Sequence, residues 1–222
     1  MNELVERIAA AVEKGKINRQ SPYPPAMRDQ DGADELTAEA LRRGIKPSEI
    51  IEGCKLGMDR IGKKFSEGAV FVPELLMAAK ANGAVMVHLR PYFQSGEVKR
   101  KGRFIIGTVK GDLHDIGKNL VAMSVEGAGW EVVDLGVDVA PAKFLSAIAQ
   151  HPGAAVGLSA LLTTTMQAMA AVVKEIRARD PKTKILIGGA PVTQAFCESI
   201  GADFYSPNPQ GAVEYLNSLA AA

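Results

Sequence analysis

The chain has 222 residues, 47% of them apolar, with 26 Lys and Arg against 25 Asp and Glu. This length supports one large domain or two small ones, and the balanced charge gives no electrostatic footprint for nucleic acid or an anionic membrane surface. Because no stretch approaches the roughly 18 apolar residues of a membrane span and the N-terminus lacks a signal-peptide core, we expect a cytoplasmic protein without a membrane partner.

The first 93 residues have the pattern of helices only. Apolar residues spaced by three or four form four stripes joined by short loops, which favours a four-helix bundle. The stripes cover residues 4–12, 33–41, 47–65 and 73–90. Glycines inside a helix each cost about 1 kcal/mol relative to Ala, so either close helix packing or contact with a bulky flat ligand must explain them. Four such glycines occur, namely Gly53, Gly57, Gly62 and Gly83.

Residues 94–102, QSGEVKRKG, are polar and contain two glycines, and we interpret them as a linker. From Arg103 onward, short β-type runs alternate with helical patterns, which predicts an α/β Rossmann-like domain with a parallel sheet between helices. The expected strands are 103–109, 131–135, 155–158, 184–187 and 203–205, and the expected helices are 116–126, 141–150, 165–179, 192–200 and 210–219.

Right-handed crossovers and short connections favour the flavodoxin-like strand order 2-1-3-4-5 for this half. We therefore expect a helical-bundle cap domain at residues 1–93, a linker at 94–102 and a five-stranded Rossmann-like domain at 103–222.

The segment Gly107–Asn119, GTVKGDLHDIGKN, carries several polar residues around two glycines, Gly111 and Gly117. It includes Asp112, His114 and Asp115, and it follows the first expected strand. Open α/β sheets bind ligands at the carboxyl ends of their strands, next to the point where strand order reverses. The order 2-1-3-4-5 places this loop beside Ser159–Thr165, the segment that follows the third strand.

The residues present exclude several familiar sites. The P-loop and the dinucleotide motif GxGxxG are both absent. A receiver domain needs an Asp at the end of the third strand, where this chain reads GLSALLTTT. The three histidines fall on different elements, which leaves too few ligands for zinc. Cys54 and Cys197 lie far apart, so neither a disulfide framework nor a Cys–His pair is indicated.

One interpretation uses the whole set of residues. His114 would be a single axial ligand to a metal that brings its other ligands in a macrocycle, and Asp112 would orient the imidazole through its other ring nitrogen. The hydroxyls after the third strand and Gly188-Gly189 after the fourth would form a slot for a long polar tail. Simpler roles stay open for the same residues: a hydrogen-bonded loop histidine, hydroxyls that cap the next helix, and a tight glycine turn.

The pattern Asp112-Leu-His114-Asp-Ile-Gly117, followed by Ser159-Ala-Leu161 and Gly188-Gly189, closely resembles the cobalamin-binding signature of methionine synthase and related corrinoid proteins. The segment KFSEGAVFVP at 64–73 is similar to the cap region of the same family. The resemblance covers about residues 30–219 and is nearest to the stand-alone corrinoid proteins of methanogen and acetogen methyltransferase systems.

The resemblance implies a role for each matching residue. His114 would replace the dimethylbenzimidazole base below cobalt, with Asp112 hydrogen-bonded to it, so that cobalamin is bound base-off/His-on. The hydroxyl that completes this relay is a serine in methionine synthase, and the matching residue here is Thr165. Phe65 and Val72 match cap residues that cover the upper, methyl-bearing face. The other contact positions are Gly111, Asp115, Gly117, Ser159, Leu161, Thr163, Gly188, Gly189 and Pro209.

The function implied is that of a methyl carrier. Its cobalamin would cycle between Co(I) and methyl-Co(III), taking a methyl group from a substrate:corrinoid methyltransferase. A methylcorrinoid:acceptor methyltransferase, with a tetrahydrofolate or thiol acceptor, would pass the group on and leave the cobalt as Co(I), and a reductive activase is a further expected partner. Because we find no catalytic barrel or second acid–base set, we do not expect catalysis by this chain alone.

Two other functions would use the same cofactor. A cobalamin-dependent sensor or storage module usually carries a DNA-binding or signalling domain, which we do not expect in this sequence. The cobalamin subunit of a mutase would prefer adenosylcobalamin and a partner barrel.

Overall fold

The computed structural model describes residues 2–220 and divides into two compact units. The first contains Met1–Arg100 with Glu126–Gly129, and the second contains Lys101–Val125 with Trp130–Ala222. The expected domain ranges include Met1, Ala221 and Ala222, which lie outside the described residues.

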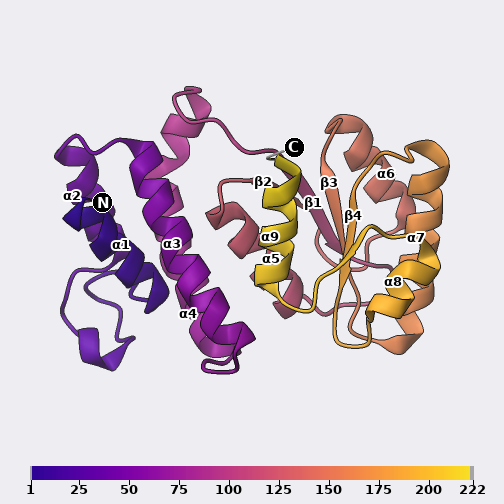
Figure 1. Ribbon diagram of the computed structural model, residues 1–222, viewed down its shortest axis with the longest axis horizontal. Helices are drawn as coiled ribbons and strands as arrows, with labels where there is room; N and C mark the ends of the chain where they lie inside the picture. Colours follow the sequence, from indigo (N-terminus) through magenta and orange to yellow (C-terminus); the bar gives the residue numbers. More distant parts are fainter. Residues whose placement is uncertain (1, 221–222) are drawn as a thin grey trace. The chain divides into compact units, whose positions relative to one another are not determined.

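The first unit is built from helices. They are α1 (Glu3–Glu13), α2 (Ala33–Arg42), α3 (Pro47–Ser66) and α4 (Val72–Gln94), with a 3-10 turn at Pro25–Met27 (Figure 1). Their starts follow from local chemistry. The Asn2 side chain caps α1 by accepting from Leu4 N at 2.9 Å, and Pro47 occupies the first turn of α3, where no N–H is needed.

Helices α1 and α3 pack closely because two glycines of α3 leave no side chain between them. A Cβ added at Gly57 would lie 2.5 Å from the carbonyl oxygen of Ala9, and one added at Gly53 would lie 2.9 Å from that of Val5. Helix packing is therefore confirmed as the reason for these two glycines. A Cβ at Gly83 would meet nothing within 4 Å, so packing does not explain that one.

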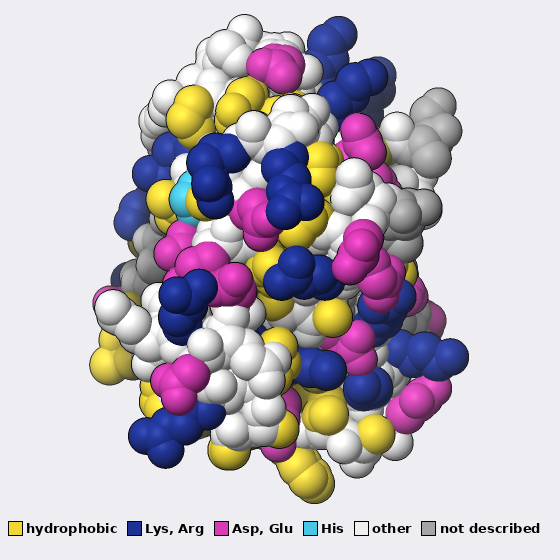
Figure 2. Space-filling model, turned by 90° about the vertical axis from the view of Figure 1, so that its left-hand side faces the viewer, with side chains coloured by type: hydrophobic (Ala, Val, Ile, Leu, Met, Phe, Trp, Pro, Cys, Tyr) yellow, Lys and Arg dark blue, Asp and Glu magenta, His cyan; other side chains and the backbone are white. Residues whose placement is uncertain are grey.

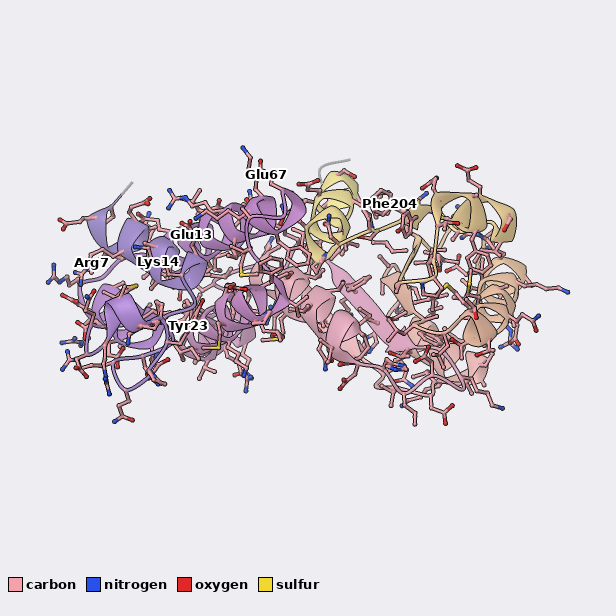
Figure 3. All side chains as sticks on the ribbon, turned by 90° about the horizontal axis from the view of Figure 1, so that it is seen from below. Arg7, Glu13, Lys14, Tyr23, Glu67 and Phe204 are labelled. Atoms are coloured by element: carbon pink, nitrogen blue, oxygen red, sulfur yellow. The ribbon has the colours of Figure 1, made fainter. Side chains whose placement is uncertain are left out.

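Ion pairs join the exposed edges of the same two helices. Glu13, labelled in Figure 3, accepts from Lys64 Nζ at 2.6 Å, and Glu6 accepts from Arg60 Nη1 at 2.6 Å. Because three of these four side chains are at least one-third exposed, the ion pairs contribute little to stability compared with the apolar contact between the helices.

The second unit contains a five-stranded parallel sheet in the order β2-β1-β3-β4-β5 (Figure 1). Its strands are β1 (Arg103–Thr108), β2 (Glu131–Asp134), β3 (Ala155–Ser159), β4 (Ile185–Gly188) and β5 (Phe204–Tyr205). Thr108 pairs with Ser159 and Ser159 pairs with Gly188. The carboxyl ends of the three central strands therefore meet at one edge of the sheet.

Helices cover both faces of this sheet. Helices α5 (Ile116–Gly127) and α9 (Pro209–Ala220) lie on one face, and α6 (Pro141–Gln150), α7 (Met166–Arg179) and α8 (Gln194–Ile200) lie on the other (Figure 1). Buried side chains of α6 and α7, such as Phe144, Met169 and Ile176, form a core with the strands. Covered strands of this kind are continuous apolar runs, as in Phe104-Ile105-Ile106 of β1.

The predicted fold class and strand order are confirmed. The predicted helix and strand boundaries lie within two residues of the observed ones, except at the end of α4. That helix continues through Pro91 to Gln94, although the apolar stripe ends at Arg90. A proline has no N–H to donate to the carbonyl four residues earlier, so Pro91 predicts the end of a helix. The helix nevertheless continues for one more turn.

The face of the molecule in Figure 2 carries Lys and Arg side chains interspersed with Asp and Glu, without a region of one sign. Among residues 2–220, none of the helices combines the length and apolar character needed to cross a bilayer.

Candidate functional site

His114 lies in the loop between β1 and α5, at the carboxyl edge of the sheet. Its side chain is 51% exposed, and its Nδ1 lies 2.8 Å from Oδ1 of Asp112. Its carbonyl oxygen accepts from the hydroxyl of the buried Thr108 at 2.8 Å. The imidazole is thus held through Nδ1, while Nε2 has no hydrogen-bond partner among the described residues.

Asp112 is fully buried and accepts hydrogen bonds from two loops. Oδ1 accepts from the backbone N of His114 at 3.1 Å as well as from the ring. Oδ2 accepts from Leu161 N at 2.7 Å, Leu162 N at 3.2 Å and Thr165 Oγ1 at 2.8 Å. One carboxylate therefore joins the β1–α5 loop to the β3–α7 loop, as the strand order predicts.

These bonds keep the carboxyl ionised. Burial by itself would raise the pKa of Asp112, but the hydrogen bonds from Leu161, His114 and Thr165 outweigh it and hold the pKa well below its usual range. An ionised carboxylate only accepts, so the proton of a neutral His114 ring must be on Nδ1. Nε2 then carries a lone pair that faces solvent, which is the form of histidine that binds metals.

Thr165 does not cap the helix that it precedes. It occupies the N-cap position of α7, but its hydroxyl makes no capping bond and instead lies 2.8 Å from Asp112 Oδ2 and 2.9 Å from Leu162 O. The capping role left open for Thr165 is therefore wrong. Its predicted place in a relay with Asp112 and His114 matches this contact, although the relay stays a prediction.

Ser159 and Thr163 are the other predicted hydroxyl contacts. Ser159 ends β3 and is partly exposed, and Thr163 is exposed in the short 3-10 turn Thr163–Thr165 before α7. Neither hydroxyl makes a hydrogen bond in the described part of the chain, residues 2–220. Both are available to a ligand at this edge.

The predicted glycines fall into two groups. Gly189 has φ +125, and a Cβ there would lie 1.8 Å from the carbonyl oxygen of Ala160, so the backbones after β3 and β4 can approach only with glycine. Gly188 would place a Cβ 3.1 Å from Ser206 O. A Cβ at Gly117, by contrast, would meet nothing within 4 Å. Packing within the protein therefore explains Gly189 and does not explain Gly117.

The remaining predicted contacts are spread over this unit and the helical one. Asp115 is exposed and its Oδ2 accepts from Asn119 Nδ2 at 3.0 Å. Pro209 is buried at the start of α9. Phe65 and Val72 lie in the helical unit, at the end of α3 and the start of α4, and their predicted roles are not tested by the geometry around His114.

Exposed apolar side chains flank His114. Seven large hydrophobic residues are exposed in the described part of the chain, and four of them lie in the two loops that Asp112 joins or at the first residue of α5. These four are Leu113 at 72%, Ile116 at 62%, Leu161 at 43% and Leu162 at 41% exposed. Exposed apolar groups of this kind mark a surface that binds something. A metal ligand surrounded by apolar groups fits a large macrocycle better than a hydrated ion. Sequence reasoning missed three of the four, although Leu and Ile in an otherwise polar loop were a signal.

The β2–α6 loop also supports the site and was not predicted to do so. Asp138 Oδ1 accepts from Gly111 N at 2.7 Å, and Asp138 N donates to Asp112 O at 3.0 Å. Gly111 itself has φ +85, which favours glycine. No motif identifies Asp138, but its position just after β2 places it at the same sheet edge.

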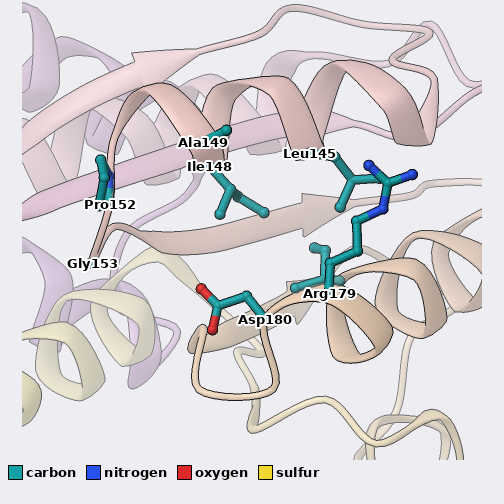
Figure 4. Close-up of a pocket in the computed structure, with 8 residues that line it drawn as sticks. Leu145, Ile148, Ala149, Pro152, Gly153, Arg179 and Asp180 are labelled. Carbon is teal, nitrogen blue, oxygen red and sulfur yellow. The ribbon is translucent and has the colours of Figure 1, made fainter.

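A pocket of about 340 Å³ lies at the opposite edge of the sheet, between the last turns of α6 and α7 (Figure 4). Leu145, Ile148 and Ile176 line it together with Arg179 and Asp180. It contains none of the predicted site residues. Within residues 2–220, no group of three or more His, Cys, Asp or Glu side chains is arranged to hold a metal ion.

Comparison with known proteins agrees with the geometry. Residues 102–213 match the B12 binding domain, and residues 27–90 match a second family model of the same description. Trimethylamine corrinoid protein 2 of Methanosarcina mazei is 41% identical over 191 residues, which cover 83% of this chain and 87% of that protein. The chain belongs to the B12-binding corrinoid proteins. Its cofactor is cobalamin or a related corrinoid.

Other known proteins match most of the length of this chain. The dimethylamine corrinoid protein of Methanosarcina barkeri is 40% identical over 188 residues, covering 82% of this chain and 88% of that protein. A cobalamin-binding protein from Desulfitobacterium hafniense superposes with a TM-score of 0.76 at 28% identity, covering 96% of this chain and 97% of that one. The methanol:cobalamin methyltransferase complex from Methanosarcina barkeri contains a chain that superposes with a TM-score of 0.80 at 28% identity, covering 100% and 81%.

Proposed function

We propose that this corrinoid protein carries methyl groups on cobalamin bound base-off, with His114 as the lower axial ligand to cobalt, and presents the cofactor to separate methyltransferases. The observation that carries the proposal is the Asp112–His114 pair. A buried, ionised carboxylate fixes the Nδ1 proton of the ring and leaves Nε2 open to solvent.

The bound cobalamin supplies the methyl-carrying chemistry, and the protein supplies ligation and orientation. Asp112 increases the donor strength of the imidazole by accepting the Nδ1 proton, and Thr165 holds Asp112 from the other side. The hydroxyls of Ser159 and Thr163 would bind the nucleotide tail. Leu113 and Ile116 would exclude water around the ligand nitrogen.

The relatives support a methylated amine as the methyl donor, because proteins 38–41% identical to this chain are trimethylamine and dimethylamine corrinoid proteins. The similarity to a chain of the methanol:cobalamin methyltransferase complex supports a methyltransferase as a direct partner. An acceptor methyltransferase, using tetrahydrofolate or a thiol, and a reductive activase complete the proposed system.

The helical part would control access to the cofactor in this scheme. Residues 1–93 would be the cap, 94–102 the hinge and 103–222 the cofactor domain, with Phe65 and Val72 over the upper face. This arrangement is supported by the match of residues 27–90 to a B12 binding domain model.

The ligand assignment is tested by the absorption spectrum of the protein loaded with cobalamin. The unsubstituted protein is expected to give a base-off, His-ligated spectrum that His114→Ala loses. His151→Ala is the matched control, because His151 caps the end of α6 at the opposite sheet edge. Retention of the His-ligated spectrum in His114→Ala would refute the assignment.

The methyl-carrier role needs a second measurement. The loaded, reduced protein is mixed with a candidate methylamine methyltransferase and trimethylamine, dimethylamine or methylamine, and methylation is followed by absorbance. Methylation with at least one amine is expected. Tight binding of cobalamin without methylation by any methyltransferase, methanol-specific enzymes included, would favour a sensor or storage module instead.

A further inference from the structure

Asp138 makes a reciprocal contact with the backbone just before the ligand histidine. Its carboxylate oxygen Oδ1 accepts from Gly111 N at 2.7 Å, and its own N–H donates to Asp112 O at 3.0 Å. The Gly111-Asp112 dipeptide is thus held at both ends by one residue of the β2–α6 loop.

The backbone of that loop would lie near β1 even without the carboxylate. Gly136 O accepts from Thr108 N at 3.0 Å, and Val139 N donates to Thr108 O at 2.9 Å. These bonds extend the pairing of β1 beyond the end of β2. The specific contribution of the Asp138 side chain is therefore the bond to the Gly111 amide.

The conformation of Asp138 is unusual for a residue with a side chain. Its φ is +52, and among the described residues Asp29, with φ +60, is the one other non-glycine residue with a positive φ. Glycine adopts this conformation most easily, while Asp and Asn tolerate it. An Asp held in this conformation in the β2–α6 loop points to a use for its carboxylate.

The contact reaches His114 through one intermediate residue. Gly111-Asp112 positions the Asp112 carboxylate, and Asp112 Oδ1 lies 2.8 Å from His114 Nδ1. We propose that Asp138 is a positioning residue that holds Gly111-Asp112 in place, so that Asp112 presents the His114 ring to cobalt. This inference rests on the proposed function, in which His114 is the axial ligand.

Two substitutions separate the hydrogen bond from the charge and the backbone conformation. Asp138→Asn removes the charge but keeps an oxygen acceptor and tolerates the positive φ. Asp138→Gly removes the acceptor and relaxes the backbone, so the fold is not strained. Asp29→Gly is the matched control, because it makes the same change at a similar φ in the helical unit.

The first readout uses the cobalamin-free protein. Exchange of the Gly111 amide, followed by NMR, is expected to be about five- to tenfold faster in Asp138→Gly, as for the loss of one hydrogen bond, and unchanged in Asp138→Asn and Asp29→Gly. The thermal midpoint of Asp138→Gly should stay within about 3 °C of the unsubstituted protein. Unchanged Gly111 exchange in Asp138→Gly would overturn the proposal.

The second readout is the axial-nitrogen splitting in the EPR spectrum of the protein loaded with Co(II) cobalamin. The fraction of molecules with this splitting should fall in Asp138→Gly and be restored in Asp138→Asn, with cobalamin affinity about tenfold weaker in the glycine variant. Equal fractions in the unsubstituted protein and Asp138→Gly would overturn the proposal, as would a loss in Asp138→Asn equal to that in Asp138→Gly.

The proposed function fails in a different way. If His114→Ala keeps the nitrogen splitting, another group is the ligand and the function proposed for His114 is wrong. The Gly111 exchange still measures the Asp138 contact in that case, because it needs no cobalamin.

Discussion

Replacing Asp112 by Asn is the sharpest test of how the site is held together. Five donors converge on this carboxylate: the backbone N and ring Nδ1 of His114, the amides of Leu161 and Leu162, and the hydroxyl of Thr165. An Asn side chain has the same shape but one NH₂ group in place of an oxygen. In one orientation the NH₂ group faces the backbone N–H of His114, and in the other it faces the amides of Leu161 and Leu162, while the remaining oxygen carries no charge.

The expected cost follows from this count. Hydrogen bonds to a charged acceptor each contribute about 1.5–3 kcal/mol and neutral ones about 0.5–1.5 kcal/mol, so the loss of at least one bond and the weakening of the others should lower the free energy of unfolding by roughly 3–5 kcal/mol. Urea unfolding of the cobalamin-free protein measures it at pH 7. Trp130 is the single tryptophan, and it is buried in the second unit, so its fluorescence reports on the unit that contains the site.

Asp115→Asn is the control for the loss of a nearby negative charge. Asp115 is exposed and accepts one side-chain bond, from Asn119, so its substitution should change the free energy of unfolding by less than about 0.5 kcal/mol. If Asp112→Asn also stayed within about 1 kcal/mol of the unsubstituted protein, the five bonds would not act together as described.

The stability difference between the two proteins should also depend on pH in a definite direction. The pKa of Asp112 is depressed in the folded protein, so its ionised form stabilises the fold above the unfolded-state pKa of about 3.9, and this contribution is lost as the pH falls toward the folded value. The stability difference between the unsubstituted protein and Asp112→Asn should be constant above about pH 5 and shrink below about pH 4. A difference that grows on acidification would contradict the reasoning.

Three further predictions follow from individual positions. Gly189→Ala should destabilise the second unit by about 2 kcal/mol or more in urea, because its Cβ would lie 1.8 Å from Ala160 O at φ +125. Gly117 lies in a helix with open space around it, so Gly117→Ala should raise the free energy of unfolding by up to about 1 kcal/mol. The same substitution should weaken cobalamin binding in a titration. Unchanged affinity would mean that the cofactor does not pass close to Gly117. Burial raises the pKa of Cys54 to about 12, so a thiol reagent should modify it only after denaturant is added.

Much of the fold was predictable because each element satisfies a local rule. The strands are short continuous apolar runs, and the helices begin at residues such as Pro47, Pro141 and Thr193 that favour a first turn or a cap. Lys16 marks the limit of such rules. A lysine after a helix predicts a solvated side chain, but Lys16 is fully buried, with Nζ donating to Ser21 O at 2.8 Å. That contact depends on the turn of the chain between Lys16 and Ser21, which the spacing of residue types in the sequence does not reveal.

The candidate site was likewise predictable only in part. Asp112 and His114 were predicted because a motif and a strand end coincide, and Thr165 because it matches the serine of the family that the sequence resembles. Asp138 was not found because its role depends on a positive φ and on one bond to a backbone amide. A residue that acts through backbone geometry leaves no side-chain pattern to recognise.

The two carboxylate oxygens of Asp112 bond to two different segments of the chain. One segment ends at Gly117 and the other starts 42 residues later at Ser159, and Asp112 joins them into one candidate site. One carboxylate oxygen holds the His114 ring, and the other holds the loop that follows Ser159. Because the carboxylate is rigid and buried, a shift of the ring would shift the acceptor for Leu161 and Thr165 as well. The position of the His114 ring and the shape of the neighbouring loop are therefore set together, and Asp138 accepts from the Gly111 amide just before the shared carboxylate.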